Sequence, residues 1–246
     1  MNEVMASGRL DAFRGALKHR LPPRYSDRPR IHHSFQNAVE QTIRPGMRIL
    51  DVGAGRRPSL QPNVRPVDAT YIGLDVSERE LAQAPEGSYD ELLLSDLSVP
   101  LSIPPVDLVV SWWTFEHLPD LPTALRVLHQ ALRPNGRLVA AFPNRRAVFA
   151  VANRLLPHRV SRRVIHGLRL RPKESVFPAH YSHCSYDELR TLGGPWHRFA
   201  ILPHYCGANY FLFNRVALAL YLSYEQHIYN TQNADLAPFF LVVADK

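Results

Sequence analysis

The chain has 246 residues, of which 46% are hydrophobic, and carries a formal net charge of +7. No apolar run approaches the about 18 residues of a membrane helix, and residues 1–25 lack a continuous apolar stretch, which argues against a membrane span and a secretory signal. We therefore expect one cytoplasmic domain over residues 1–246, with a full core, reduced thiols at Cys184 and Cys206, and no metal site.

Residues 1–45 are predicted to form an N-terminal helical segment. A weak helical pattern is set by Leu10, Phe13 and Leu17, and a stronger one covers residues 31–43. The sequence "RPG" at 44–46 ends this second helix, because proline and glycine both interrupt helical structure.

Residues 46–144 alternate between short apolar runs and helical patterns. Strands are predicted at 47–52, 70–75, 91–95, 106–111 and 137–142, with a helix beginning at Ser77, a helix over 121–132 and a turn at "RPNG". This rhythm predicts an α/β fold with a Rossmann-like, doubly wound and mostly parallel sheet. Residues 186–246 add a helix and two strands, 197–205 and 238–246, a closing pair with an antiparallel edge strand.

Residues 145–185 interrupt this rhythm and are predicted to be an α-helical insertion over the strand ends. One helical face carries apolar residues, and Pro157 splits the pattern into two short helices. Eight arginines lie between Arg145 and Arg171. The insertion is compatible with a lid, a membrane-surface element or a docking site for an acidic substrate. The apolar positions are Val148, Phe149, Val151, Ala152, Leu155 and Leu156.

Polar residues stand where four predicted strands end. In a parallel sheet these ends share one edge, which favours an adenosine-like ligand lying across them. A carboxylate at Asp75 suits two vicinal ribose hydroxyls, while Gly53 and Gly55 allow close approach of the backbone. Pro58 occupies the third glycine position of dinucleotide loops and disfavours a pyrophosphate. The four strand-end residues are Asp51, Asp75, Asp96 and Ser111.

The segments "ILDVGAGRRP", "YIGLDVS", "LLLSDLSVPL" and "DLVVSWWTFEHLPDLPTALRVLHQALRPNGRLVAAFPN" carry a family resemblance. In order and spacing they resemble the motifs of class I S-adenosylmethionine-dependent methyltransferases, in particular the ubiquinone/menaquinone-biosynthesis-like "type 11" group. The resemblance covers residues 35–144, with an echo in the closing "FFLVVADK". It implies S-adenosyl-L-methionine as the cofactor.

The resemblance also implies roles for individual residues. Asp75 would hold the ribose hydroxyls, Asp96 would accept from the adenine amino group, and Arg56 or Arg57 is a candidate contact for the methionine carboxylate. Each acid keeps a structural alternative: Asp51 as a turn cap, Asp75 as the N-cap of the next helix, and Asp96 as a solvated loop residue. The implied cofactor-binding set is Asp51, Gly53, Ala54, Gly55, Asp75, Val76, Asp96, Leu97, Ser111 and Trp112.

Methyl transfer is an in-line displacement, so a general base is needed only where the acceptor must lose a proton. Three histidines are candidate catalytic residues: His117 in "FEHLPD", and His180 and His183 in the insertion. His117 is equally compatible with a structural or cofactor-pocket role, and the other two with the surface. Tyr181 is a further candidate contact.

These observations predict methyl transfer to a small-molecule acceptor, with a hydroxyl of a sugar-, lipid- or nucleotide-linked metabolite favoured. The arginines favour a phosphorylated or acidic acceptor and leave peripheral contact with an anionic membrane open. The strand end "SWWT" and the lack of an RNA-binding motif argue against nucleic acid. The alternatives are an NAD(P)-dependent oxidoreductase and a non-catalytic S-adenosylmethionine-binding protein. The oligomeric state is not predicted.

Overall fold

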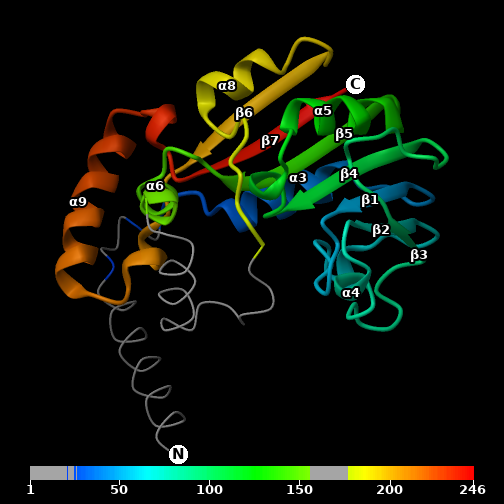
Figure 1. The fold of residues 1–246 in the computed structure, drawn as a ribbon, viewed down its shortest axis with the longest axis horizontal. Helices are drawn as coiled ribbons and strands as arrows, with labels where there is room; N and C mark the ends of the chain where they lie inside the picture. Colours follow the sequence, from blue (N-terminus) through cyan, green and yellow to red (C-terminus); the bar gives the residue numbers. More distant parts are fainter. Residues whose placement is uncertain (1–20, 22–24, 26, 156–176) are drawn as a thin grey trace, which may run out of the picture.

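The computed structural model describes residues 21, 25, 27–155 and 177–246. Seven strands form one sheet in the order β3-β2-β1-β4-β5-β7-β6 (Figure 1). The strands β1 to β5 run parallel, and β7 is antiparallel to both β5 and the edge strand β6. The predicted Rossmann-like sheet with its antiparallel closing pair is therefore confirmed. The bounds are β1 Arg48–Val52, β2 Thr70–Asp75, β3 Glu91–Leu94, β4 Val106–Trp112, β5 Leu132–Pro143, β6 Arg198–His204 and β7 Phe239–Asp245.

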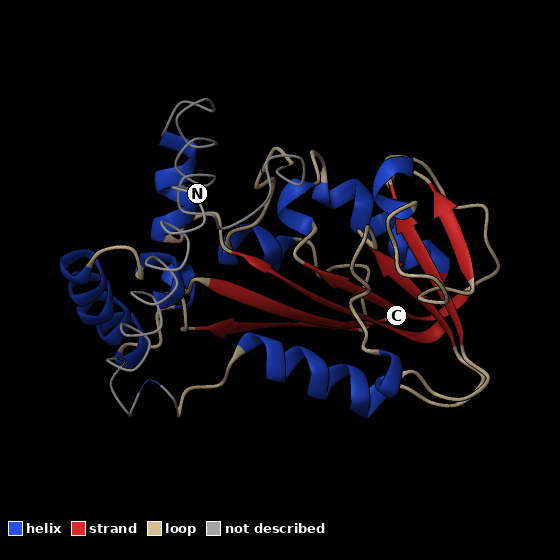
Figure 2. Ribbon diagram, turned by 90° about the horizontal axis from the view of Figure 1, so that it is seen from below, coloured by secondary structure: helices blue, strands red, loops and turns tan. Residues whose placement is uncertain are grey.

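Helices cover both faces of the sheet (Figure 2). The helix α3 packs on one face, and α5 and α8 pack on the other. The helices are α3 Ile31–Thr42, α4 Glu78–Leu81, α5 Leu121–Ala131, α6 Val148–Leu155, α8 Tyr186–Thr191 and α9 Arg215–Asn230, with short 3₁₀ turns η1 Pro62–Val64, η2 Phe115–His117, η4 Ala208–Phe211 and η5 Ala234–Leu236.

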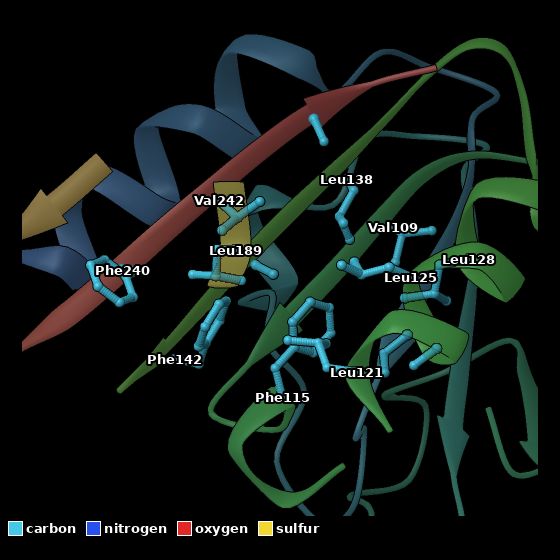
Figure 3. Close-up of a cluster of buried hydrophobic side chains, with 14 of the residues drawn as sticks. Val109, Phe115, Leu121, Leu125, Leu128, Leu138, Phe142, Leu189, Phe240 and Val242 are labelled. Atoms are coloured by element: carbon cyan, nitrogen blue, oxygen red, sulfur yellow. The ribbon is translucent and has the colours of Figure 1, made fainter. Parts of the chain in front are cut away.

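The core on the α5 face follows from the alternation of side chains along the strands and from the helical repeat of apolar residues in α5. Alternate residues of the strands, such as Val109 and Leu138, point toward α5. They pack with Leu121, Leu125 and Leu128 of the helix (Figure 3). The helix begins where the Asp120 carboxylate accepts from the Thr123 amide at 3.2 Å. This packing fixes the position of β4, whose end forms part of the site.

The predicted turn "RPNG" lies inside β5. The register to β4 jumps from Val106 opposite Leu132 to Leu108 opposite Arg137, and Asn135 has a φ of 63°. The prediction of a separate turn was wrong, because the four residues form an irregularity within one continuous strand rather than a break before it.

The insertion is described only in part. Its helix α6 places Phe149 on the Tyr210 ring, with centroids 4.0 Å apart, and beside Phe239. Val148 and Leu155 are 38% and 79% exposed, so the predicted apolar face is only partly buried. The predicted second helix after Pro157, with Leu156, and the pattern at Leu10, Phe13 and Leu17 lie outside the described residues. The described chain contains no helix long and apolar enough to cross a membrane.

Candidate functional site

A cleft of about 530 Å³ opens at the carboxyl ends of β1, β2 and β4. It brings together ten of the thirteen predicted site residues. Because they come from five segments of the chain, only the sheet topology places them in one cleft. These residues are Gly53, Ala54, Gly55, Asp75, Val76, Asp96, Leu97, Trp112, His117 and His180.

The glycine turn after β1 is bonded to the end of β2. The amides of Gly53 and Ala54 donate to the Leu74 carbonyl at 2.9 and 3.0 Å, and the Gly55 amide donates to Asp75 at 3.0 Å. Gly53 has a φ of 75°, and a Cβ there would overlap the Thr114 side chain. The turn therefore requires glycine on two grounds, backbone conformation and space.

The Asp75 carboxylate accepts hydrogen bonds from two backbone amides and can still accept others. One carboxylate oxygen accepts from the Gly55 amide, and the other accepts from the Ser77 amide at 2.9 Å. Each oxygen has a further lone pair, so two vicinal hydroxyls can be accepted together. Burial raises the pKa of Asp75 above its ordinary value. The N-cap of α4 is Ser77, whose hydroxyl accepts from the Glu80 amide, so the alternative role of Asp75 as that cap is excluded.

Asp51 lies beneath the cleft and not in it. It is fully buried and accepts from the amide and hydroxyl of Ser59 at 2.8 and 2.6 Å and from the hydroxyls of Tyr71 and Tyr89. Alternation along β1 turns its side chain toward the α3 face, and its burial raises its pKa. Asp51 is therefore placed below the cleft lining, where its carboxylate secures the turn.

Ser111 is the second predicted residue outside the cleft lining. It is buried, and its hydroxyl donates to the Val52 carbonyl at 3.1 Å. The bond ties the end of β4 to the end of β1. Its neighbour Trp112, also in the predicted cofactor-binding set, lines the cleft, whereas Ser111 does not.

The two arginines of the turn differ in their contacts. Arg56 donates two hydrogen bonds to Glu80, at 2.9 and 2.6 Å, which lower the pKa of that carboxyl. Arg57 is exposed on the cleft lining, and its side chain has no partner among the described residues. Arg57 is therefore the better placed of the two to receive a carboxylate.

His117 follows β4 on η2 and lines the cleft. Its Nδ1 lies 2.9 Å from the Pro178 carbonyl, which can only accept, so Nδ1 carries the proton and Nε2 is the acceptor in the neutral imidazole. The carboxylate of Glu116 lies 3.7 Å from Nε2. This geometry suits a group that takes up a proton.

The other two predicted histidines, His180 and His183, differ in their position relative to the cleft. His180 lines the cleft, and its amide donates to the Glu116 carbonyl at 2.8 Å, which holds the segment after residue 176 beside η2. His183 is exposed outside the cleft lining, where its ring contacts the Ser182 hydroxyl. Tyr181 is buried.

The lining residues that the sequence interpretation missed include Glu80, Trp113, Thr114 and Phe177. Trp113 has a φ of 59°, rare for so large a side chain, and stacks on Trp112 with centroids 4.3 Å apart. The adjacent tryptophans in "SWWT" were the feature of the sequence that could have predicted Trp113 as a lining residue. Both tryptophans line the cleft.

The described arginines of the insertion are engaged within the protein. Arg145 pairs with Glu188, and Arg146 lies 3.1 Å from Asp187 and 3.2 Å from Asp235. The guanidinium of Arg154 donates to the Arg145 carbonyl at 2.7 Å. Arg145 and Arg146 therefore fasten the insertion to α8 and η5, whereas Arg154 bonds within the insertion. The other five arginines lie outside the described residues.

Fold and cleft together define a Rossmann-like α/β protein with an open cleft at its strand ends. A family model described as "Methyltransferase domain" matches residues 19–199, and the chain belongs to this family. No curated protein sequence matches. The cofactor is S-adenosylmethionine, and the narrower "type 11" assignment stays a prediction.

Solved methyltransferase structures share the fold. Phosphoethanolamine N-methyltransferase 2 of Haemonchus contortus, with S-adenosylmethionine bound, has a TM-score of 0.53 and 13% identity over 87% of this chain and 52% of its own. Mycolic acid cyclopropane synthase CmaA1, with S-adenosylhomocysteine bound, has a TM-score of 0.50 and 19% identity, over 87% of this chain and 83% of its own. A putative methyltransferase in complex with the Haloferax volcanii Trm112 activator has a TM-score of 0.53 and 18% identity, over 87% of this chain and 88% of its own. The chain thus spans about half the length of the Haemonchus enzyme.

Proposed function

We propose that the protein transfers the methyl group of S-adenosylmethionine to a hydroxyl oxygen of a small-molecule acceptor. The observation that carries the proposal is the cleft itself, which joins the Gly53–Gly55 turn and Asp75 at one end to His117 at the other. A NAD(P)-dependent reaction finds no support, because Arg57 and Pro58 follow the glycine turn where a dinucleotide loop packs closely.

The cleft residues fit the cofactor. Asp75 would accept from both ribose hydroxyls, and Val76 and Leu97 would flank the adenine, with Asp96 at its amino group. Asp96 accepts from the Ser98 amide through one oxygen, so its second oxygen serves the ligand. Arg57 would receive the methionine carboxylate.

When bound, S-adenosylmethionine supplies an electrophilic methyl carbon to the acceptor oxygen. Nε2 of His117 takes the hydroxyl proton as the new oxygen–carbon bond forms and the sulfur–carbon bond breaks. Glu116 stabilises the resulting imidazolium, and the Pro178 carbonyl keeps the ring oriented. Trp112 and Trp113 exclude water from this end of the cleft.

Calorimetric titration with S-adenosylhomocysteine, with NAD as the comparison, tests the cofactor. Binding of the former alone is expected, and Asp75→Ala should weaken it by about 1–3 kcal/mol, since two hydroxyls lose their acceptor. Transfer of labelled methyl to fractionated cell extract then tests activity and isolates the acceptor. Cofactor binding without transfer to any fraction would identify a non-catalytic binding protein.

A further inference from the structure

Tyr89 connects the buried Asp51 carboxylate to the glycine turn of the cleft. Its hydroxyl lies 3.0 Å from Asp51 and 3.3 Å from the Ala54 carbonyl, and it donates to both acceptors. Burial and the neighbouring Asp51 raise the pKa of Tyr89 above its ordinary value, so the hydroxyl keeps its proton and remains a donor. Because Ala54 lines the cleft within the Gly53–Gly55 turn, this bond reaches the turn from below.

The Tyr89 ring is held in place by contacts outside the cleft lining. It lies over Gly73, where an added Cβ would be 2.9 Å from the ring, and it stacks on Tyr71 with centroids 4.9 Å apart. The residue before it is fixed as well, because the Arg65 guanidinium donates to the Ser88 carbonyl at 2.7 Å. These contacts fix the position from which the hydroxyl reaches the turn.

The peptide group between Ala54 and Gly55 is bonded on both sides. Its carbonyl accepts from the Tyr89 hydroxyl and, at 3.3 Å, from the Arg57 amide, and its N–H donates to the Asp75 carboxylate at 3.0 Å. A trans peptide group is planar, with its C=O and N–H pointing in opposite directions. A rotation that breaks the Tyr89 bond therefore also turns the N–H away from Asp75.

We propose that Tyr89 is a positioning residue of the cofactor site. Its hydroxyl orients the Ala54–Gly55 peptide group and, through that group, the Asp75 carboxylate. The inference rests on the proposed function, in which Asp75 accepts from the ribose hydroxyls. Tyr89 lies outside the cleft lining and acts without touching the cofactor. The effect is expected on the nucleoside part of the cofactor, because this is the part that Asp75 would contact.

Tyr89→Phe tests the hydroxyl, with calorimetric titration of S-adenosylhomocysteine and of adenosine. Both ligands should bind about fivefold more weakly, which is the effect of one hydrogen bond, since both carry the ribose. Tyr71→Phe is the matched control, because the Tyr71 hydroxyl also donates to Asp51 but accepts from the Leu60 amide and not from the turn. The control should keep both affinities within about twofold. Unchanged affinities in Tyr89→Phe, or equal losses in the two variants, would overturn the proposal.

A double-mutant cycle with Asp75→Ala distinguishes positioning from a general loosening of the fold. Tyr89→Phe should weaken S-adenosylhomocysteine binding about fivefold in the wild-type background and less than twofold in the Asp75→Ala background, where the carboxylate that it orients is gone. Loss of stability alone would act by the same factor in both backgrounds, and that result contradicts a positioning role. If Tyr89→Phe does not fold in urea-unfolding measurements, Gly73→Ala, which displaces the ring, takes its place: weaker binding is expected, and unchanged binding refutes the proposal.

Failure of the proposed function gives a different result. If S-adenosylhomocysteine does not bind the wild-type protein, the proposed function fails and the role of Tyr89 fails with it. If Asp75→Ala weakens binding and the variants at Tyr89 and Gly73 do not, the role of Tyr89 alone fails.

Discussion

The side chain of Thr114 occupies the space that a Cβ on Gly53 would fill. The Thr114 hydroxyl also donates to the Val52 carbonyl at 3.2 Å, so the residue that follows the two tryptophans closes over the end of β1. The glycine turn and the exit from β4 therefore form one packed unit. The shape of the cofactor end depends on both.

Gly53→Ala should abolish S-adenosylhomocysteine binding. The new methyl group would collide with Thr114 in addition to straining a backbone at φ 75°. Gly46→Ala is a matched control, because Gly46 has the same φ with nothing within 4 Å of the added Cβ. Denaturant unfolding should show a loss of about 1–2 kcal/mol for the control and more for Gly53→Ala. Equal losses, with binding retained in both, would contradict the role of Thr114.

The strands and the mostly parallel sheet could be predicted from the sequence because each buried strand is a short apolar run. Hydrophobic periodicity also predicted α3 and α5, and the acids and glycines at strand ends predicted most of the cleft lining. Asp75 and Asp96 fit this reasoning, because Asp75 is the last residue of β2 and Asp96 follows shortly after the end of β3.

The role of Asp51 could not be predicted in the same way. Gly73, opposite Asp51 in the register, leaves a space against which the Tyr89 ring packs, and this ring brings a hydroxyl to the carboxylate. Such a contact joins residues 38 positions apart. Strand alternation shows which face a residue takes, but not which distant hydroxyl will meet it there.

Arg57→Gln is expected to weaken S-adenosylhomocysteine binding by about tenfold and to leave adenosine binding unchanged. Adenosine lacks the carboxylate that the guanidinium would receive, so the two ligands separate this contact from general damage to the cleft. Calorimetric titration of both ligands makes the measurement. Arg56→Gln disrupts the pair with Glu80 and should affect both ligands alike. An equal effect of Arg57→Gln on adenosine would remove the assignment.

Glu225 ties the segment before α3 to α9. Its fully buried carboxylate accepts from the Gly207 amide at 2.6 Å and the Tyr221 hydroxyl at 3.0 Å, with the Arg28 guanidinium 3.5 Å away. Burial raises the pKa of Glu225 from 4.5 to about 6. Because the folded state binds the proton more tightly, the associated stability is complete below about pH 4.5 and is lost as the pH rises through 6.

Glu225→Gln should remove this pH dependence. The free energy of unfolding of the wild type, relative to the variant, should fall by about 2 kcal/mol between about pH 4 and pH 7.5. Urea unfolding at both pH values makes the comparison, with the exposed Glu40→Gln as control. A difference that is constant with pH would show an unshifted pKa, and one that grows as the pH rises would show a lowered pKa; either result contradicts the prediction.

His117→Gln should lower the rate of methyl transfer by about a hundredfold or more while S-adenosylhomocysteine affinity stays within about twofold, because the base acts on the acceptor and not on the cofactor. His183→Gln, outside the cleft lining, is the matched histidine control and should leave the rate unchanged. Single-turnover transfer of labelled methyl measures all three proteins. A His117→Gln variant that keeps the wild-type rate would assign His117 a structural role, since Gln can still donate to the Pro178 carbonyl.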